Sequence, residues 1–456
     1  MVSLSARGGG PPRYRRDGNP VPPGAIRIHA DSALFQHAGW YILQGATPYV
    51  DFWDLKPPLI YAVTTALAAL SGGNMHVLHV LSIVVAVGAV VAGATLVGVL
   101  AHRLTGNGTA AVIAGATVFV VPSLYGFPVA GIRPKYLTFA FGTAALVVAL
   151  DDRPTLGGVL VAISTGFWQL AAPLTILVGG IAWQRDGVRG LARTVAGGLA
   201  VTLLVVGPFV LAGVTIPLFL QTVLGPLYGI EGYTIAGRLL AFLLEFGPGV
   251  LLVPLGGAGL VIGLRRDVTR YWWVGLGAGI YLLQIFLELQ GAIEWIFGLV
   301  FLALGVAVVV DRTNRPVLVA GVIAVLALTS LVWGAGWLGQ GAVATELEQH
   351  SVPPYETLPE DPAAIDSMET IYWEKQEPAS CHYRLGHKQK AYAQRVGESL
   401  TVETCGRVAI RAAPTGVGTR VDSGARVRAL VRTKCSDQHR SESSLWTLDS
   451  GIARGE

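Results

Sequence analysis

The chain has 456 residues, of which 52% are hydrophobic and only 14% are charged, and its formal net charge is +4. A soluble domain would carry about a quarter charged residues, so this composition excludes an ordinary soluble protein. Apolar runs of about 18 to 25 residues recur between Val77 and Gly339, and each is long enough to cross a bilayer. A β-barrel would alternate polar and apolar residues instead. The predicted fold class is therefore an all-α polytopic membrane protein, and nothing in the charge indicates a nucleic-acid partner.

The N-terminal part divides into two segments. Residues 1–28 are rich in Gly, Pro and Arg, and we expect them to be disordered and to hold no signal peptide. Residues 29–76 are predicted to form an outer catalytic loop with interfacial helices. Within it, residues 57–71 begin with two prolines and are expected to form an interfacial or re-entrant helix rather than a span. An outer loop at this position requires either a translocated N-terminus or a preceding helix that a longer version of the chain would carry.

The region 77–339 is predicted to be a multi-pass transmembrane domain. Its ten apolar segments lie at approximately 77–101, 109–125, 136–150, 156–167, 169–183, 195–214, 238–264, 271–288, 293–310 and 316–339. If residues 156–183 form two short segments that break around Phe167-Trp168-Gln169, every Arg-rich loop falls on one side, which is then cytoplasmic. Such broken segments are tolerated where they line a cavity.

The same count places residues 340–456 outside, as a small extracytoplasmic C-terminal region. All three cysteines of the chain lie there. In an oxidising compartment, Cys381 and Cys405 are the pair that we expect to form a disulfide. Free thiols are the alternative, and Cys435 is left over in either case.

Charged residues gather on the predicted outer side. The first loop carries Asp31, Asp51, Asp54 and Lys56, and the short loop "GIRPKYL" carries Arg133 and Lys135. The last two break the tendency for basic residues to stay inside. Uncompensated cations in such a loop indicate an anionic partner such as a phosphate, although contact with lipid headgroups is an equal alternative.

Other polar residues are predicted to face the same cavity. The predicted substrate-binding residues are Gln169 at the broken-helix tip, Tyr228 and Glu231 of "LGPLYGIEGYTIAGR", and Glu288 and Glu294 of "LELQGAIEW", and Arg238 is a further candidate for binding the donor phosphate. Carboxylates beside cations suit glycosyl transfer from a lipid phosphate, because a cation neutralises the departing phosphate and a carboxylate takes the proton of the attacking hydroxyl. The alternatives are a solvated loop acid at Asp31 and incidental charge in an aromatic belt at Asp51 and Asp54. His76 and His79 share a helix face, and without a third ligand we expect a structural or headgroup role rather than a metal site.

The stretch "DSALFQHAGWYILQGATPYVDFWDLKPPLIY" resembles the first outer loop of the glycosyltransferase C superfamily. The chain looks most like the archaeal dolichyl-phosphate-mannose mannosyltransferases, which are related to protein O-mannosyltransferases and aminoarabinose transferases. The resemblance implies that Asp31 is the catalytic acid and that Lys56, Arg133 and Lys135 lie near the donor phosphate. The superfamily often has two acids where this chain has Asp31-Ser32, so a second acid, if one is needed, would come from Asp51, Asp54 or elsewhere. The resemblance also implies a first helix before this loop, for which we expect no counterpart in this sequence.

The predicted function is transfer of mannose from dolichyl phosphate mannose to a protein-linked glycan. The partners would be a polyprenyl (dolichyl) phosphate sugar, a glycoprotein acceptor and the bilayer of the cell membrane, in the setting of N-glycosylation at the cell surface. We expect no required cofactor and no metal site, although a divalent cation at the carboxylates is an alternative. Another lipid-linked sugar, a lipid acceptor, or a transporter with Glu245 as its mid-segment acid are the competing interpretations.

Overall fold

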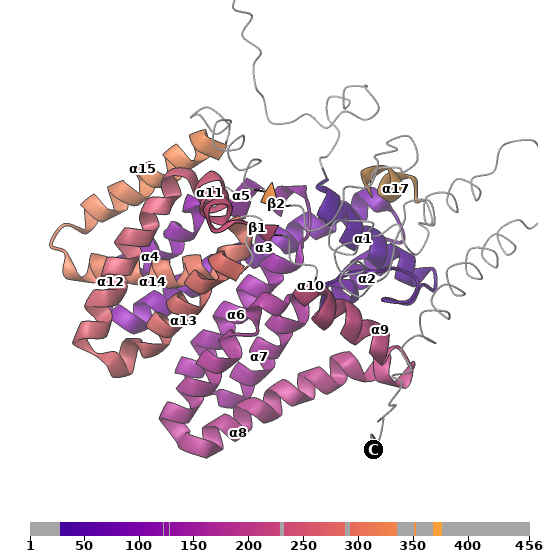
Figure 1. Ribbon diagram of the computed structural model, residues 1–456, viewed down its shortest axis with the longest axis horizontal. Coiled ribbons are helices and arrows are strands. Elements are labelled where there is room, and N and C mark those ends of the chain that lie inside the picture. Colours follow the sequence, from indigo (N-terminus) through magenta and orange to yellow (C-terminus); the bar gives the residue numbers. More distant parts are fainter. Residues whose placement is uncertain are drawn as a thin grey trace, which may run out of the picture.

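The computed structural model describes residues 28–121, 123–126, 128–228, 232–287, 292–334, 351–352 and 368–375. The predictions for residues 1–27, for the cysteines Cys381 and Cys405, and for most of residues 340–456 lie outside this part of the chain. Within it the protein is almost entirely helical (Figure 1).

The predicted first outer loop contains two helices, α1 (Ala30–Leu43) and α2 (Leu59–Leu70). Helix α2 has 12 residues, too few to cross a bilayer, and it occupies the stretch for which a non-spanning helix was predicted. The two helices cross backbone to backbone at Gly39, where an added Cβ would overlap the main chain of Thr64. Asp31 therefore lies in the first turn of a helix that is fixed against its neighbour.

The next helices begin the membrane region. They are α3 (Met75–Thr105), α4 (Gly108–Thr117) with the 3₁₀ turn η1 (Val118–Val120), α5 (Ser123–Gly126), η2 (Pro128–Ala130), α6 (Pro134–Leu150) and α7 (Pro154–Phe167). Proline at the first position starts both α6 and α7, because the missing N–H is not needed there. Gly106 directly follows α3 and caps its C-terminus with a φ of 73°, a conformation that suits glycine.

The predicted break around Phe167-Trp168-Gln169 is confirmed. Helix α7 ends at Phe167, the 3₁₀ turn η3 spans Gln169–Ala171, and α8 (Leu174–Leu211) follows. The prediction of two segments at 169–183 and 195–214 is confirmed in outline, because α8 consists of two helices that meet at a kink at Asp186 and Gly187, although the connection between them is shorter than predicted. Gly187 has a φ of 54°, so the Arg-rich stretch turns sharply there without a long loop.

The second half of the membrane region also consists of helices joined by short turns. It comprises α9 (Thr215–Phe219), the π-helical η4 (Leu220–Leu224), α10 (Gly225–Tyr228), α11 (Ile235–Phe246), η5 (Gly247–Leu251), α12 (Leu252–Arg266), α13 (Val268–Leu287), η6 (Ala292–Trp295), α14 (Ile296–Arg312) and α15 (Pro316–Gly334). The single segment predicted at 238–264 is divided at Gly247-Pro248-Gly249, where a proline and a glycine with positive φ interrupt the helix. Glycines let α12 and α14 approach closely, since a Cβ at Gly259 would overlap the Gly305 carbonyl.

Among the residues that the structure describes, four helical stretches are long and apolar enough to cross a membrane: Met75–Thr105, Gln169–Leu211, Ile235–Arg266 and Pro316–Trp333. The protein is thus a multi-pass membrane protein, while the count of ten spans remains a prediction. A small departure from the all-α prediction is the pairing of β1 (Gly232–Tyr233) with β2 (Ser351–Val352), an antiparallel ladder of two residues per strand.

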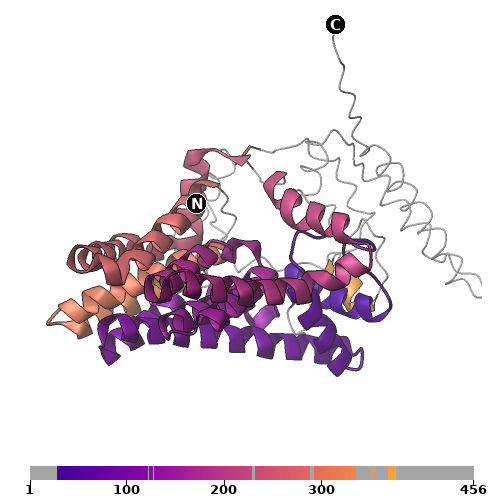
Figure 2. The same ribbon diagram turned by 90° about the horizontal axis from the view of Figure 1, so that it is seen from below.

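The helices pack in several groups, and α1 and α2 of the first loop lie at one end of the molecule (Figure 1). Helices α6, α7 and α8 pack together, α12 packs on α14, and α1 packs on α2. A short helix from the C-terminal region, α17 (Met368–Glu374), packs against α1 although more than 300 residues separate them (Figures 1 and 2). This end of the molecule holds the charged residues considered next.

Candidate functional site

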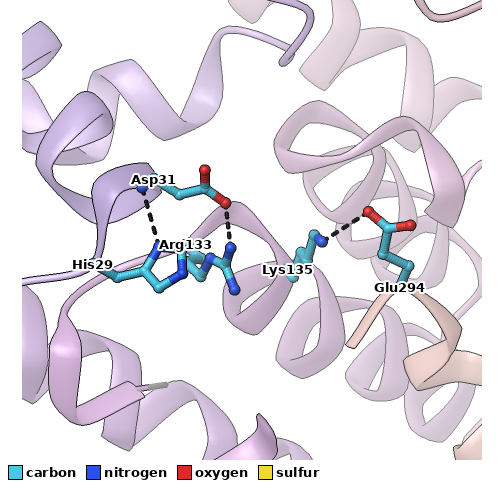
Figure 3. A network of polar contacts seen from close by, with 5 residues as sticks. All are labelled: His29, Asp31, Arg133, Lys135 and Glu294. Carbon is cyan, nitrogen blue, oxygen red and sulfur yellow. Dashed lines mark hydrogen bonds and ion pairs between the residues drawn. The ribbon is translucent and has the colours of Figure 1, made fainter. Parts of the chain in front are cut away.

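Asp31 and Arg133 form an ion pair between the beginnings of two helices (Figure 3). The guanidinium of Arg133 donates a hydrogen bond to the Asp31 carboxylate, from the residue directly before α6 to the first turn of α1. The Arg133 side chain is 9% exposed, whereas that of Asp31 is 38% exposed. A buried cation therefore holds a carboxylate that remains open to solvent on one side.

His29 fixes the position of Asp31 from the other side. Its ring Nδ1 accepts a hydrogen bond from the Asp31 backbone N–H at 3.1 Å, which caps the first turn of α1. Its own backbone N–H donates to the Ala130 carbonyl at 3.1 Å, and this bond ties the start of α1 to η2. Burial, followed by the positive charge of Arg133, lowers the pKa of the His29 imidazole, although the Asp31 carboxylate acts in the opposite direction. The neutral ring is the form that can accept at Nδ1.

Lys135 forms a second ion pair with Glu294 (Figure 3). Its Nζ lies 3.0 Å from Glu294 Oε1, and both side chains are 10% exposed. The premise that Arg133 and Lys135 are uncompensated cations is therefore wrong, because each has a carboxylate partner. Distant segments supply both carboxylates, which explains why the short loop can carry two cations inside the protein.

Trp168 connects these pairs to the first loop. The indole is 3% exposed and belongs to the break between α7 and η3. Lys135 Nζ lies 5.2 Å from the ring centroid and Lys56 Nζ lies 5.8 Å from it. Both distances are within the range of cation–π attraction. The structure thus brings Lys56, Arg133, Lys135, Asp31 and Glu294 together, and it adds Trp168, which the sequence had indicated only as the point of a helix break.

Hydrogen bonds hold the loop that carries Lys56. The Lys56 N–H donates to Asp54 Oδ1 at 3.1 Å, and the Tyr49 hydroxyl donates to the Lys56 carbonyl at 2.7 Å. Gln169 donates its Nε2–H₂ to the Leu55 carbonyl and to the Thr222 carbonyl. Burial, and then the Asp54 charge, raise the pKa of the Tyr49 hydroxyl, so it remains a donor. The half-buried Lys56 side chain is consequently presented by a fixed backbone.

Gln221 is a further residue that sequence analysis missed. It lies in the π-helical turn η4 and is 6% exposed. Its amide donates to the Tyr49 carbonyl at 2.8 Å, and its carbonyl accepts from the Asp54 N–H at 3.0 Å. Single turns of π-helix occur frequently at functional sites. Gln221 therefore joins the first loop to a segment that lies more than 160 residues further along the chain.

The remaining predicted acids of the first loop contact their own loop. Asp51 accepts from the Thr47 N–H at 2.7 Å, as in a capped turn. Asp54 is 1% exposed, and its Oδ2 has no hydrogen-bond partner among the described residues. Their role as a second acid remains a prediction.

Other predicted residues lie elsewhere or outside the description. Arg238 on α11 donates to the Phe286 carbonyl on α13. Tyr228 ends α10, but its side chain is not described, and Glu231 and Glu288 lie outside the described residues. Across the part of the chain that the structure describes, no group of three His, Cys, Asp or Glu side chains could hold a metal ion. A divalent cation at this site remains an untested alternative.

Comparison with known proteins adds independent information. The family described as DolP-mannose mannosyltransferase matches residues 45–206, which include Lys56, Arg133, Lys135 and Trp168. The chain is 27% identical over 425 residues to "Dolichol phosphate-mannose mannosyltransferase" of Haloferax volcanii, covering 83% of this chain and 90% of that protein.

Two solved structures align with this chain at low sequence identity. ArnT from Cupriavidus metallidurans, bound to undecaprenyl phosphate, aligns with a TM-score of 0.48 at 13% identity, over 85% of this chain and 75% of that chain. The archaeal oligosaccharyltransferase AglB from Archaeoglobus fulgidus aligns with a TM-score of 0.41 at 13% identity, over 73% and 53% of the two chains.

The family match and the curated relative confirm the resemblance drawn from the sequence. The chain is a multi-pass membrane enzyme of the glycosyltransferase class. Within that class it is a mannosyltransferase similar to the dolichol phosphate-mannose mannosyltransferases, and the transporter interpretation is set aside.

Proposed function

We propose that the enzyme transfers mannose from dolichyl phosphate mannose to a hydroxyl of a protein-linked glycan on the outer face of the cell membrane. The observation that carries the proposal is the half-exposed Asp31 carboxylate held by the buried Arg133, with Lys56 beside Trp168 in the same region. The match to the mannosyltransferase family supports the choice of donor.

The proposed reaction is a single inverting displacement. The acceptor hydroxyl oxygen attacks C1 of mannose, the bond from C1 to the phosphate oxygen breaks, and its electron pair leaves with dolichyl phosphate. Asp31 takes the proton of the hydroxyl as general base. Asp31 suits this role better than Asp54, because its carboxylate is 38% exposed at the side chain whereas the whole Asp54 residue is 1% exposed.

We assign a different role to each of the three cations. Arg133 has five N–H donors, so it can hold Asp31 and still donate to an adjacent phosphate. Lys56 is half-buried on a fixed backbone and suits the leaving phosphate, since a positioned cation stabilises the charge that develops there. Lys135 is neutralised by Glu294, so we assign it to holding α6 against η6 rather than to direct contact with the donor.

The test is transfer of labelled mannose by membranes that contain the full chain. Dolichyl phosphate mannose is supplied, and label is followed into protein-linked glycan for the wild type and for Asp31→Asn. We expect the variant to lose about 100-fold or more of the rate, the usual contribution of a general base. Asp152→Asn is a matched control, because Asp152 also pairs with an arginine, Arg185, but in an exposed loop far from α1 in sequence.

Three results would contradict parts of the proposal. Equal rates for the wild type and Asp31→Asn would remove Asp31 from the role of base. Label recovered in lipid rather than in protein would replace the glycoprotein acceptor with a lipid. Transfer from a different lipid-linked sugar, with none from dolichyl phosphate mannose, would change the donor.

A further inference from the structure

Helix α17 is anchored to the helix that carries Asp31. Tyr372 of α17 is fully buried, and its hydroxyl lies 3.0 Å from Gln36 Oε1 on α1 and 2.5 Å from the Met75 carbonyl at the start of α3. Gln36 is also fully buried, and its Nε2 lies 3.3 Å from His79 Nδ1. This buried network fixes α17 beside α1 (Figure 1).

A cavity of about 340 Å³ lies between α17 and residues 72–76. Trp373 and Lys375 line it from one side, and Asn74, His76 and the Gly72-Gly73 backbone line it from the other. Small-molecule sites range from about 300 to 1,000 Å³. This cavity is at the lower end of that range, which suits a ligand of one or two rings rather than a lipid chain.

The wall of the cavity combines an aromatic surface with polar groups. The Trp373 indole packs on the His76 imidazole with ring centroids 4.6 Å apart. Beside them are the Asn74 amide, the Lys375 ammonium and the glycine backbone. A pyranose ring presents one apolar C–H face and a rim of hydroxyls, so an aromatic face with adjacent donors and acceptors is complementary to it.

An anion suits the cavity less well, although it lies at the start of α3. Helix N-termini bind anions through backbone N–H groups that have no partner. Here the Asn74 side-chain oxygen already accepts from the His76 N–H at 3.0 Å and the Val77 N–H at 3.3 Å. The cap thus occupies two of the donors that a phosphate would need.

His79 lies between the wall of the cavity and the backbone next to the Asp31–Arg133 pair. The His79 ring packs edge-on against Trp373 with centroids 6.0 Å apart. On its other side, a Cβ placed on Gly131 would lie 3.2 Å from His79 Cε1 and 2.9 Å from Ser32 Cβ. Gly131 is two residues from Arg133, and Ser32 directly follows Asp31.

We propose that this cavity binds a sugar unit of the acceptor glycan, with Trp373 as the stacking surface. The inference rests on the proposed function, and it assigns the acceptor side of the site, whereas Lys56 and Arg133 serve the donor side. A sugar bound here would lie next to the helix that carries the proposed base. The C-terminal region then has a defined role, because α17 supplies the aromatic wall.

The first experiment measures sugar binding without a donor. The purified full chain in detergent is titrated with methyl α-mannoside, methyl α-glucoside and methyl β-galactoside by saturation-transfer NMR. We expect saturable binding of at least one glycoside, weakened about tenfold in Trp373→Leu and largely kept in Trp373→Tyr. Trp183→Leu is the control, since Trp183 is 52% exposed on α8 and does not line the cavity.

Several outcomes would overturn the inference. They are no binding of any of the three glycosides by the wild type, equal binding by Trp373→Leu, and displacement of the bound glycoside by millimolar inorganic phosphate. Lys375→Gln offers a second variant at an exposed position outside the Tyr372 network, and we expect it to weaken glycoside binding about threefold. Unchanged glycoside binding in Lys375→Gln would also count against the site.

The second experiment separates this inference from the proposed function. In the mannose-transfer assay, Trp373→Leu should raise the KM for the glycan acceptor about tenfold while kcat and the KM for the donor stay within about twofold. An unchanged acceptor KM with normal transfer would overturn the inference and leave the function intact. Glycoside binding that depends on Trp373, in a wild-type chain that transfers no mannose, would support a sugar site and refute the proposed function.

Discussion

Arg133 and Asp31 are separated by 102 residues, yet the buried guanidinium of the first holds the half-exposed carboxylate of the second. Each residue lies at the start of a helix, so the ion pair fixes α1 and α6 relative to each other. The asymmetry of burial has a consequence for mutation. Loss of Asp31 leaves a buried cation without its carboxylate, whereas loss of Arg133 leaves a carboxylate that solvent can reach.

Substitution of either residue should therefore reduce activity to a similar degree but reduce stability to different degrees. We expect Arg133→Gln and Asp31→Asn each to reduce mannose transfer about 100-fold or more. In detergent, however, Asp31→Asn should lower the Tm by more than Arg133→Gln does. Thermal unfolding of both variants beside the transfer assay measures the two effects, and a larger Tm loss in Arg133→Gln would contradict the reasoning from burial.

Removing one partner of the Lys135–Glu294 pair should destabilise the protein more than removing both partners together. Both side chains are 10% exposed, so Lys135→Met alone, which strands the Glu294 charge, should cost about 3–5 kcal/mol in the free energy of unfolding. The double variant Lys135→Met/Glu294→Leu removes both charges and should cost clearly less than the sum of the single variants. A double-mutant cycle by unfolding in detergent measures the coupling.

A matched control for that cycle is the exposed pair Arg193–Asp186, with side chains 52% and 46% exposed. Exposed pairs typically contribute about 0–1 kcal/mol, so its cycle should show little coupling. Equal coupling at the two pairs would show that burial does not explain the importance of Lys135 and Glu294.

Substitutions at Lys56 and Gln221 should change kcat and the KM for the donor more than the KM for the acceptor. Lys56→Met removes the cation that we assign to the leaving phosphate, so kcat should fall about 100-fold. Gln221→Leu keeps that cation but removes the bonds to Tyr49 and Asp54, so it should mainly raise the donor KM. Steady-state kinetics with varied donor distinguish the two patterns. Gln184→Leu is a control amide at a different location, bonded to the Thr269 carbonyl.

Local features of the fold could be predicted from sequence, but long-range pairings could not. The helix break at Phe167-Trp168-Gln169 and the short helix after Pro57-Pro58 follow from local residue patterns, and the structure has both. The two helices of α8 were also predicted as separate segments, but the loop between them was made too long because a polar, Arg-rich stretch reads as a loop, whereas only Asp186 and Gly187 leave helical geometry.

For the candidate site, too, the sequence indicated residues but not the long-range pairs that they form. Asp31, Lys56, Arg133 and Lys135 were grouped correctly by the expected topology and the resemblance. The partner of each cation was not predicted, because Lys135 and Glu294 are 159 residues apart and no local pattern links them. Gln221 had no signal of its own, since a lone glutamine in an apolar run reads as an ordinary surface residue, and the π-helical turn that presents it is visible only in three dimensions.

Protonation of His29 should make the stability of the folded protein depend on pH. Burial and Arg133 lower its pKa below the usual 6.5, so the folded protein favours the neutral ring that caps Asp31. Above pH 6.5 the ring is neutral in both folded and unfolded chains, and its contribution to stability is fully present. As the pH falls from about 6.5 through the lower folded pKa, the unfolded chain binds the proton first, and stability is progressively lost.

The measurement is the Tm between pH 7.5 and 5 for the wild type and for His29→Asn. Asparagine is a good N-cap that does not titrate in this range, so the variant should lose less Tm on acidification than the wild type. The difference between the two curves isolates His29 from the other histidines. Transfer activity should follow the same order, since protonation at Nδ1 removes the acceptor for the Asp31 N–H and loosens the turn that positions the carboxylate. Parallel curves for the two proteins would show that this cap does not govern the response to acid.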